Sequence, residues 1–284
     1  MKPKITEGKC FCGRTLVLAT EKVELAVTLD VGPRIISAKR VGGSNIFFED
    51  TGEEITKDCS GVYGKGNVWK IYGGHRLWIS PEDETTYVPD NGAVTYTEKG
   101  DSVSFTCADW RVKDVAPTIA VTFLDANTVR VEHTLKSLRA NNRVAIWALT
   151  VCKCGGTLTV PLSAEDTGYV ANRNLVLWAY TDIKDKRMQI ENDRVVIIGS
   201  KGAKGPLKLG LFKREICATY ELEGTIFTKK IAVPEGVSGA DYPDYNCNFE
   251  TYTSKLMHEI ETLSPLVTLG KGQEITHTEI WSLT

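Results

Sequence analysis

A stretch between residues 72 and 82 concentrates side chains that could do chemistry. Behind two glycines it places His75, Arg76, Trp78 and Glu82 close together. A solvated loop has no need of tryptophan, and a core strand has no need of histidine next to arginine. The mixture is typical of a polar site with an aromatic wall, a surface that suits a sugar ring.

Residues 256–265 add two carboxylates, Glu259 and Glu261. Side chains alternate between the two faces of a strand, so we expect both to share a face with Met257 and Leu263. A partly buried carboxylate has a raised pKa, which suits a base working near neutral pH. Glu259 is therefore the candidate base, and the alternative for it is a solvent-facing strand carboxylate.

The same alternation separates His75 from Arg76. By parity Tyr72, Arg76 and Trp78 form one set, and His75 belongs to the other. Both can reach one site only if the glycines permit a bulge. Two interpretations of His75 stay open: a catalytic acid next to Glu259, or a core histidine with a hydrogen-bonded partner. Arg76, with up to five donors, is expected to face a ligand together with Trp78.

The elements that must position these residues are strands. Apolar residues recur with a period of two, and convincing amphipathic helices are missing. This pattern predicts one all-β domain over residues 1–284, a large antiparallel sandwich or barrel. The expected strands cover residues 22–29, 93–97, 102–106, 118–123, 128–133, 144–150, 156–160, 175–180, 194–198, 207–212, 215–220, 225–233, 248–252, 257–263 and 274–283.

Composition excludes several classes of partner. The chain has 284 residues, a net charge of −2 and well-mixed signs, which argues against nucleic acid. We expect no membrane span, because no apolar run approaches 18 residues, and we expect a cytoplasmic protein, because the N-terminal residues resemble no signal peptide. A small neutral ligand remains compatible with this charge.

The eight cysteines are expected to be free thiols, as in a reducing compartment. The pairs Cys10/Cys12 and Cys152/Cys154 could together supply four thiolates to zinc. However, zinc is usually wrapped by a C-x-x-C turn, so we expect no metal. His133, His258 and His277 show no ligand spacing either, and no cofactor is expected.

Three regions carry a resemblance to a known superfamily. Residues 29–48 look like an opening hairpin in which Asn45 precedes an apolar pair, residues 73–76 look like a glycine-led strand, and residues 259–263 look like a segment with Glu followed by Thr-Leu. In this order and spacing they resemble the galactose mutarotase-like, or aldose 1-epimerase-like, superfamily, in an uncharacterised bacterial branch. The resemblance spans nearly the whole chain and implies a large antiparallel β-supersandwich.

The resemblance implies that Glu259 is the catalytic base. It also implies a histidine acid on a central strand, but the corresponding residues 143–150 contain none, and Trp147 or Thr150 occupies that region. Either His75 serves as the acid from a different strand, or the ordinary chemistry is lost.

Two functions follow from these expectations. The first is a carbohydrate-active protein that interconverts sugar anomers by acid/base ring opening, and the alternative is a carbohydrate-binding protein without that chemistry. The expected partner is a small sugar or sugar derivative, and an acid group on it could meet Arg34, Arg76 or Arg173. The expected catalytic residues are Glu259 and His75, and the expected binding residues are Arg76, Trp78, Glu82, Glu261, Arg34 and Trp147.

Overall fold

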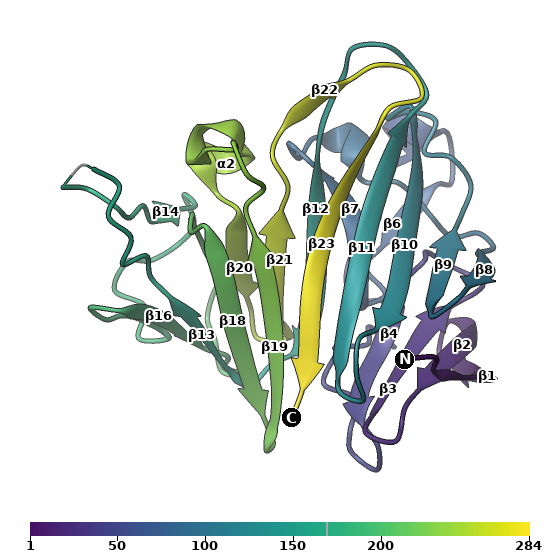
Figure 1. The fold of residues 1–284 in the computed structure, drawn as a ribbon, viewed down its shortest axis with the longest axis horizontal. Helices are drawn as coiled ribbons and strands as arrows, with labels where there is room; N and C mark the ends of the chain where they lie inside the picture. The colour runs from purple at the N-terminus through teal and green to yellow at the C-terminus, as the bar shows by residue number, and fades with distance from the viewer. Residues whose placement is uncertain (169) are drawn as a thin grey trace.

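The computed structural model describes residues 1–168 and 170–284, and almost all of their regular structure is β. Two large antiparallel sheets lie face to face (Figure 1), and the hydrophobic core lies between them. No helix in the described part of the chain is long and apolar enough to cross a membrane. The architecture is the all-β one that the period of two predicted.

The first sheet has 11 strands in the order β1-β2-β3-β4-β7-β12-β21-β20-β17-β14, with β22 paired to β12. These strands are β1 (Lys4–Cys10), β2 (Gly13–Ala19), β3 (Val23–Thr28), β4 (Ile35–Arg40), β7 (Gly74–Ser80), β12 (Asn142–Lys153), β14 (Val176–Leu177), β17 (Leu207–Leu211), β20 (Phe249–Thr253), β21 (Met257–Leu263) and β22 (Val267–Leu269).

The second sheet has 10 strands in the order β15-β16-β13-β18-β19-β23-β11-β10-β9-β8. They are β8 (Thr95–Lys99), β9 (Ser102–Thr106), β10 (Val115–Phe123), β11 (Thr128–Ser137), β13 (Thr157–Pro161), β15 (Met188–Ile190), β16 (Arg194–Ile198), β18 (Glu215–Leu222), β19 (Thr225–Ala232) and β23 (Glu274–Leu283). The remaining elements are a small sheet of β5 (Thr56–Asp58) and β6 (Val68–Lys70), helices α1 (Ser60–Tyr63) and α2 (Pro243–Asn246), and 3₁₀ turns η1 (Glu84–Thr86) and η2 (Gly239–Asp241).

Strand β7 pairs with β12 in a regular register from Gly74↔Val151 to Ser80↔Ala145. Gly73, just before the strand, and Gly74, its first residue, make no bulge in the pairing with β12. They allow a close approach instead: Gly73 has a φ of 99°, and a Cβ there would lie 2.1 Å from the carbonyl oxygen of Phe48. The regular register decides which side chains of β7 share a face.

Candidate functional site

A pocket of about 240 Å³ opens on the face of the 11-stranded sheet that points away from the other sheet. Strands β7, β12, β17, β20 and β21 form its floor, and the segments 55–71 and 82–87 with Tyr180 form its sides. Its lining residues are Ile55, Trp69, Ile71, Arg76, Trp78, Glu82, Tyr87, Trp147, Leu149, Tyr180, Lys208, Tyr252, Met257 and Glu259. The pocket brings together five of the residues expected from the sequence: Glu259, Arg76, Trp78, Glu82 and Trp147.

The strand register explains this convergence. Trp78 of β7 lies opposite Trp147 of β12, and two residues further along Arg76 lies opposite Leu149. On the other side of β12, the pairing with β21 places Glu259 opposite Val151. Alternation then turns all of these side chains to one face of the sheet.

Three tryptophans build one wall of the pocket. Trp69 stacks on Trp78, and Trp78 stacks on Trp147, with ring centroids 5.4 Å apart in both pairs. The guanidinium carbon of Arg76 lies 3.8 Å from the centroid of Trp78, and the ammonium of Lys208 lies 4.6 Å from that of Trp147. The rings therefore position two cations through cation–π contacts. This packing does not support the expected stacking of a sugar on Trp78, because Arg76 covers that ring.

Glu259 is the isolated carboxylate of the pocket. Its residue is only 9% exposed, and its carboxylate makes no hydrogen bond to any described residue. Burial, reinforced by the charge of Glu261, raises the pKa of Glu259 to about 8, although Arg76 and Lys208 pull it down. A carboxyl group with this pKa exchanges a proton close to neutral pH.

Arg76 is the second charged group without a partner. It is 3% exposed, and no nitrogen of its guanidinium donates a hydrogen bond within residues 1–168 and 170–284. Burial, with the charge of Arg34, lowers the pKa of Arg76 to about 9, while Glu259 acts in the opposite direction. A planar group with five donors is therefore held unsatisfied at the pocket.

Lys208 lines the pocket and is held by two buried carboxylates. Its Nζ lies 2.7 Å from Glu250 and 3.0 Å from Glu261, and the indole of Trp147 donates to Glu261 at 2.9 Å. Burial disfavours the ammonium, but the charges of Glu261 and Glu250 outweigh it and raise the pKa of Lys208. Burial raises the pKa of Glu250. Glu261 shares a face of β21 with Glu259, but it is bound by Lys208 and Trp147 and does not line the pocket.

Two further expected binding residues have protein partners. The phenol of Tyr87 donates a short hydrogen bond to the carboxylate of Glu82 at the edge of the pocket. Arg34 does not line the pocket: both of its terminal nitrogens bind the carboxylate of Asp90, at 2.6 and 2.8 Å, with both side chains buried. Arg173, noted as a possible anion contact, instead donates to backbone carbonyls of residues 163 and 192.

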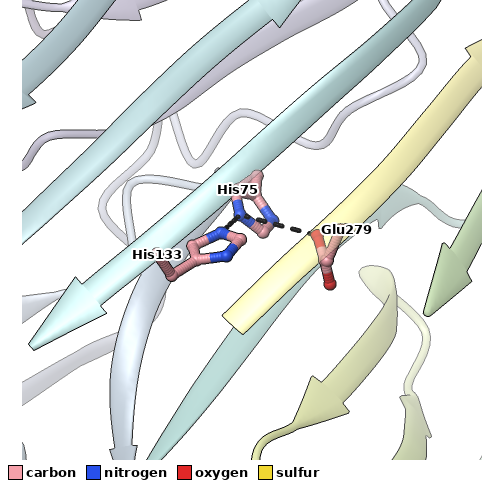
Figure 2. Close-up of side chains that lie close together, drawn as sticks. All are labelled: His75, His133 and Glu279. Atoms are coloured by element: carbon pink, nitrogen blue, oxygen red, sulfur yellow. Dashed lines mark hydrogen bonds and ion pairs between the residues drawn. The ribbon is translucent and has the colours of Figure 1, made fainter. Parts of the chain in front are cut away.

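His75 lies on the opposite face of β7, between the sheets, and does not line the pocket with Glu259. The regular register sends consecutive side chains to opposite faces, which corrects the placement of His75 next to Glu259. Its Nε2 lies 2.6 Å from Nε2 of His133 on β11, and its Nδ1 lies 2.8 Å from the hydroxyl of Thr150. Figure 2 shows the two rings directed at each other, with Glu279 beside them.

The hydrogen bonds fix the tautomers of this pair. Nδ1 of His133 lies 3.1 Å from the carbonyl oxygen of His277, which only accepts, so this Nδ1 carries the proton. Nε2 of His133 then accepts from Nε2–H of His75, and the hydroxyl of Thr150 donates to Nδ1 of His75. Both rings are neutral. Burial keeps the pKa of His75 well below its usual value and lowers that of His133 to about 3.

Glu279 completes the polar network between the sheets. Its carboxylate accepts from Trp281 at 2.8 Å and from Thr262 at 2.5 Å, and Nζ of Lys229 lies 2.9 Å away. Ligand atoms of His75, His133 and Glu279 all lie within 4.8 Å of one another. A cation there would have to replace the bond between the histidines and sit next to the ammonium of Lys229. We therefore assign the cluster a structural role in joining the sheets.

The eight cysteines are all free. Cys10 and Cys12 have their sulfurs 3.3 Å apart in the turn between β1 and β2. Cys152 and Cys154 lie on the central strand β12 and its end and are buried. Within the described residues, no group of three or more cysteines gathers as a metal site.

The buried titratable groups predict a pH-dependent stability. The folded-state pKa values of His133, His258 and His277 are lowered to about 3 and that of His75 also lies well below its usual value, so below pH 6.5 the unfolded chain binds more protons at these sites. Glu259 and Glu250, with raised pKa values, act oppositely, because they favour the folded state at low pH. On unfolding, the four histidines take up about four protons and the two glutamates release about two, so the net uptake is about two protons. The free energy of unfolding should therefore fall by about 2 to 3 kcal/mol per pH unit between pH 6 and 5.

Urea denaturation at pH 7, 6 and 5 measures this slope. In a His258→Gln variant, the slope of the free energy of unfolding against pH should be smaller by roughly 1.4 kcal/mol per pH unit, which is the contribution of one proton. A urea midpoint that stays constant from pH 7 to 5 would show that the histidines are not held neutral.

The sequence interpretation missed several lining residues, namely Trp69, Tyr87, Tyr180, Lys208 and Tyr252, and it missed Glu250 beneath them. A signal existed for two of them. Lys208 is a lone charge in the apolar strand β17, and Glu250 follows Phe249 in β20. A charged residue within a buried strand is rarely left without a partner or a function.

No family model and no curated protein matches this chain by sequence, whereas solved structures resemble its fold. A galactose mutarotase-like protein from Clostridium acetobutylicum superposes with a TM-score of 0.54 at 11% identity, covering 100% of this chain and 98% of that one. A galactose mutarotase related enzyme from Lactobacillus acidophilus superposes with a TM-score of 0.50 at 10% identity, covering 95% and 97%. The two-sheet architecture and these likenesses show that the chain has the galactose mutarotase-like β-supersandwich fold that its sequence resembles.

Proposed function

We propose that this chain is a carbohydrate-active protein that binds a monosaccharide in the pocket of Glu259 and interconverts its anomers. The observation that carries the proposal is the buried carboxyl of Glu259, which has no hydrogen-bond partner among the described residues and a pKa that burial raises to about 8. Unpaired donors of Arg76 and the phenols of Tyr180 and Tyr252 line the same pocket and offer hydrogen bonds to hydroxyls. The volume of about 240 Å³ suits a small ligand.

Anomer interconversion needs one base and one acid. In its ionised form Glu259 would take the proton of the anomeric hydroxyl while an acid protonates the ring oxygen, so that the ring C–O bond opens; rotation and closure then give the other anomer. No histidine lines the pocket in the described part of the chain. Tyr252, paired with Glu259 across β20 and β21, is the candidate acid, because burial raises its pKa and keeps the phenol protonated.

A second candidate is sugar binding without catalysis. It is favoured by the displacement of His75 to the other face of β7 and by the pKa of Glu259, which leaves only a minor ionised fraction at pH 7. The two candidates share one binding site and differ in whether the bound sugar exchanges its anomers.

Titration with pentoses and hexoses tests the shared claim, with tryptophan fluorescence as the signal because three tryptophans line the pocket. A Tyr180→Ala variant should weaken binding about tenfold, since it removes a phenol from the edge of the pocket. Tyr180 is 48% exposed, so its loss should not disturb folding.

The matched control is Tyr96→Ala, which removes a tyrosine that is 42% exposed on β8 of the other sheet. It should bind as the wild type does. Equal affinities for the wild type and Tyr180→Ala would place the binding site elsewhere.

A further inference from the structure

One of the two cations that line the pocket lacks an ion-pair partner among the described residues. Lys208 is matched by Glu261 at 3.0 Å and Glu250 at 2.7 Å. Arg76 has no comparable partner: no carboxylate of the described residues forms an ion pair with it, and its Nε and Nη1 are buried without hydrogen bonds. Of the charged groups that line this pocket, Arg76 is the cation whose donors are unused.

Glu259 does not neutralise Arg76. The two interact electrostatically, but no ion pair within 4.0 Å joins them. Burial also keeps most of the Glu259 carboxyl protonated at pH 7, since its pKa is about 8. Arg34, whose positive charge acts on Arg76, is itself bound to Asp90. Among the described residues Arg76 therefore has no carboxylate at ion-pair distance, and the carboxylate of Glu82, which also lines the pocket, accepts a hydrogen bond from Tyr87 instead.

A buried cation with free donors is costly until an anion binds it. Sugar hydroxyls can accept hydrogen bonds from a guanidinium, but they leave its charge unbalanced. A carboxylate or phosphate satisfies both the charge and the fork geometry of the donors. Trp78, 3.8 Å from the guanidinium carbon, and Trp69, 4.7 Å from it, fix the plane in which the donors point.

We propose that the sugar bound in this pocket carries an anionic group, a carboxylate or a phosphate, that pairs with Arg76. The inference rests on the proposed sugar-binding function and narrows its substrate class to acidic sugars. The proton-transfer role of Glu259 is separate from it, because the anionic group meets Arg76 and the anomeric centre meets Glu259.

Calorimetric titration of the wild type with glucose, galactose, glucuronate, galacturonate and glucose 6-phosphate tests the class. An acidic sugar should bind about 10- to 100-fold more tightly than its neutral parent, the range expected for a charge-assisted hydrogen bond. Tighter binding of the uronates identifies a carboxylate, and tighter binding of the phosphate identifies a phosphate; either result supports the inference. Equal affinities would overturn it and leave sugar binding intact. If none of the five binds, the proposed function fails for these sugars and the inference fails with it.

Two variants locate the effect. Arg76→Gln should reduce the ratio of acidic to neutral affinity to near one, and Arg76→Lys should restore part of the ratio, because it keeps the charge and loses the fork. The control Lys230→Gln removes an exposed charge from β19 and should leave the ratio unchanged. A ratio that survives Arg76→Gln would assign the anion to another residue, and circular dichroism confirms that each variant is folded.

Discussion

Replacing Glu259 with glutamine is expected to slow anomer interconversion at least about 100-fold, because a positioned base contributes 10²- to 10⁴-fold to the rate. Glutamine keeps the size of the side chain and cannot take a proton. In the wild type the rate should rise about tenfold per pH unit and level off near pH 8, since the ionised fraction of Glu259 grows until its pKa of about 8.

Polarimetry on a freshly dissolved sugar that binds, between pH 6 and 9, measures both effects. Glu221→Gln, an exposed carboxylate on β18, is the matched control and should keep the wild-type rate and pH profile. Full activity in Glu259→Gln would show that Glu259 is not the base. A wild type that binds sugar and shows no catalysis at any pH would select the second candidate, binding alone.

Replacing Lys208 with methionine is expected to destabilise the fold by about 3 to 5 kcal/mol, the cost of leaving a buried charge without its partner. Its two carboxylates, Glu250 and Glu261, are both 0% exposed and would lose the only cation within 4.0 Å in the described residues. The loss should grow from pH 6 to 8.5, because burial raises the pKa of Glu250, and a protonated Glu250 at the lower pH needs no cation.

Urea denaturation of Lys208→Met at these two pH values measures the loss. A second replacement, Glu261→Gln, should recover part of it by removing one of the stranded charges. Lys230→Met, which changes an exposed lysine, should stay within about 0.5 kcal/mol of the wild type. A Lys208→Met protein as stable as the wild type at pH 8.5 would contradict the buried ion cluster.

Alternation along single strands was readable from the sequence. It placed Arg76 with Trp78, and Glu259 with Glu261, on shared faces, and it separated His75 from Arg76. The structure shows these faces as expected, and it decides between the two interpretations of His75: a regular β7 leaves it in the core. The resemblance implied a histidine in the site. Because β7 has no bulge, alternation keeps His75 on the other face of the strand.

Pairing between distant strands was not readable. Lys208 contacts Glu261 because β17 pairs with β20 and β20 pairs with β21. The sequence around Lys208 contains no signal for this strand order. Arg34 looked like a free ligand contact because its partner Asp90 lies 56 residues away in the chain. Trp69 was missed although it lies close to residues 72–82 in the sequence, because it reaches the pocket from β6, a strand outside the large sheets.

A crystal structure with the tightest-binding sugar of the calorimetric panel tests the central claim most directly. We expect the sugar in the pocket on β7, β12 and β21, with a hydroxyl within hydrogen-bond distance of the carboxyl of Glu259 and the acidic group on the guanidinium of Arg76. A sugar bound at any other surface, with Glu259 and Arg76 untouched, would contradict the account.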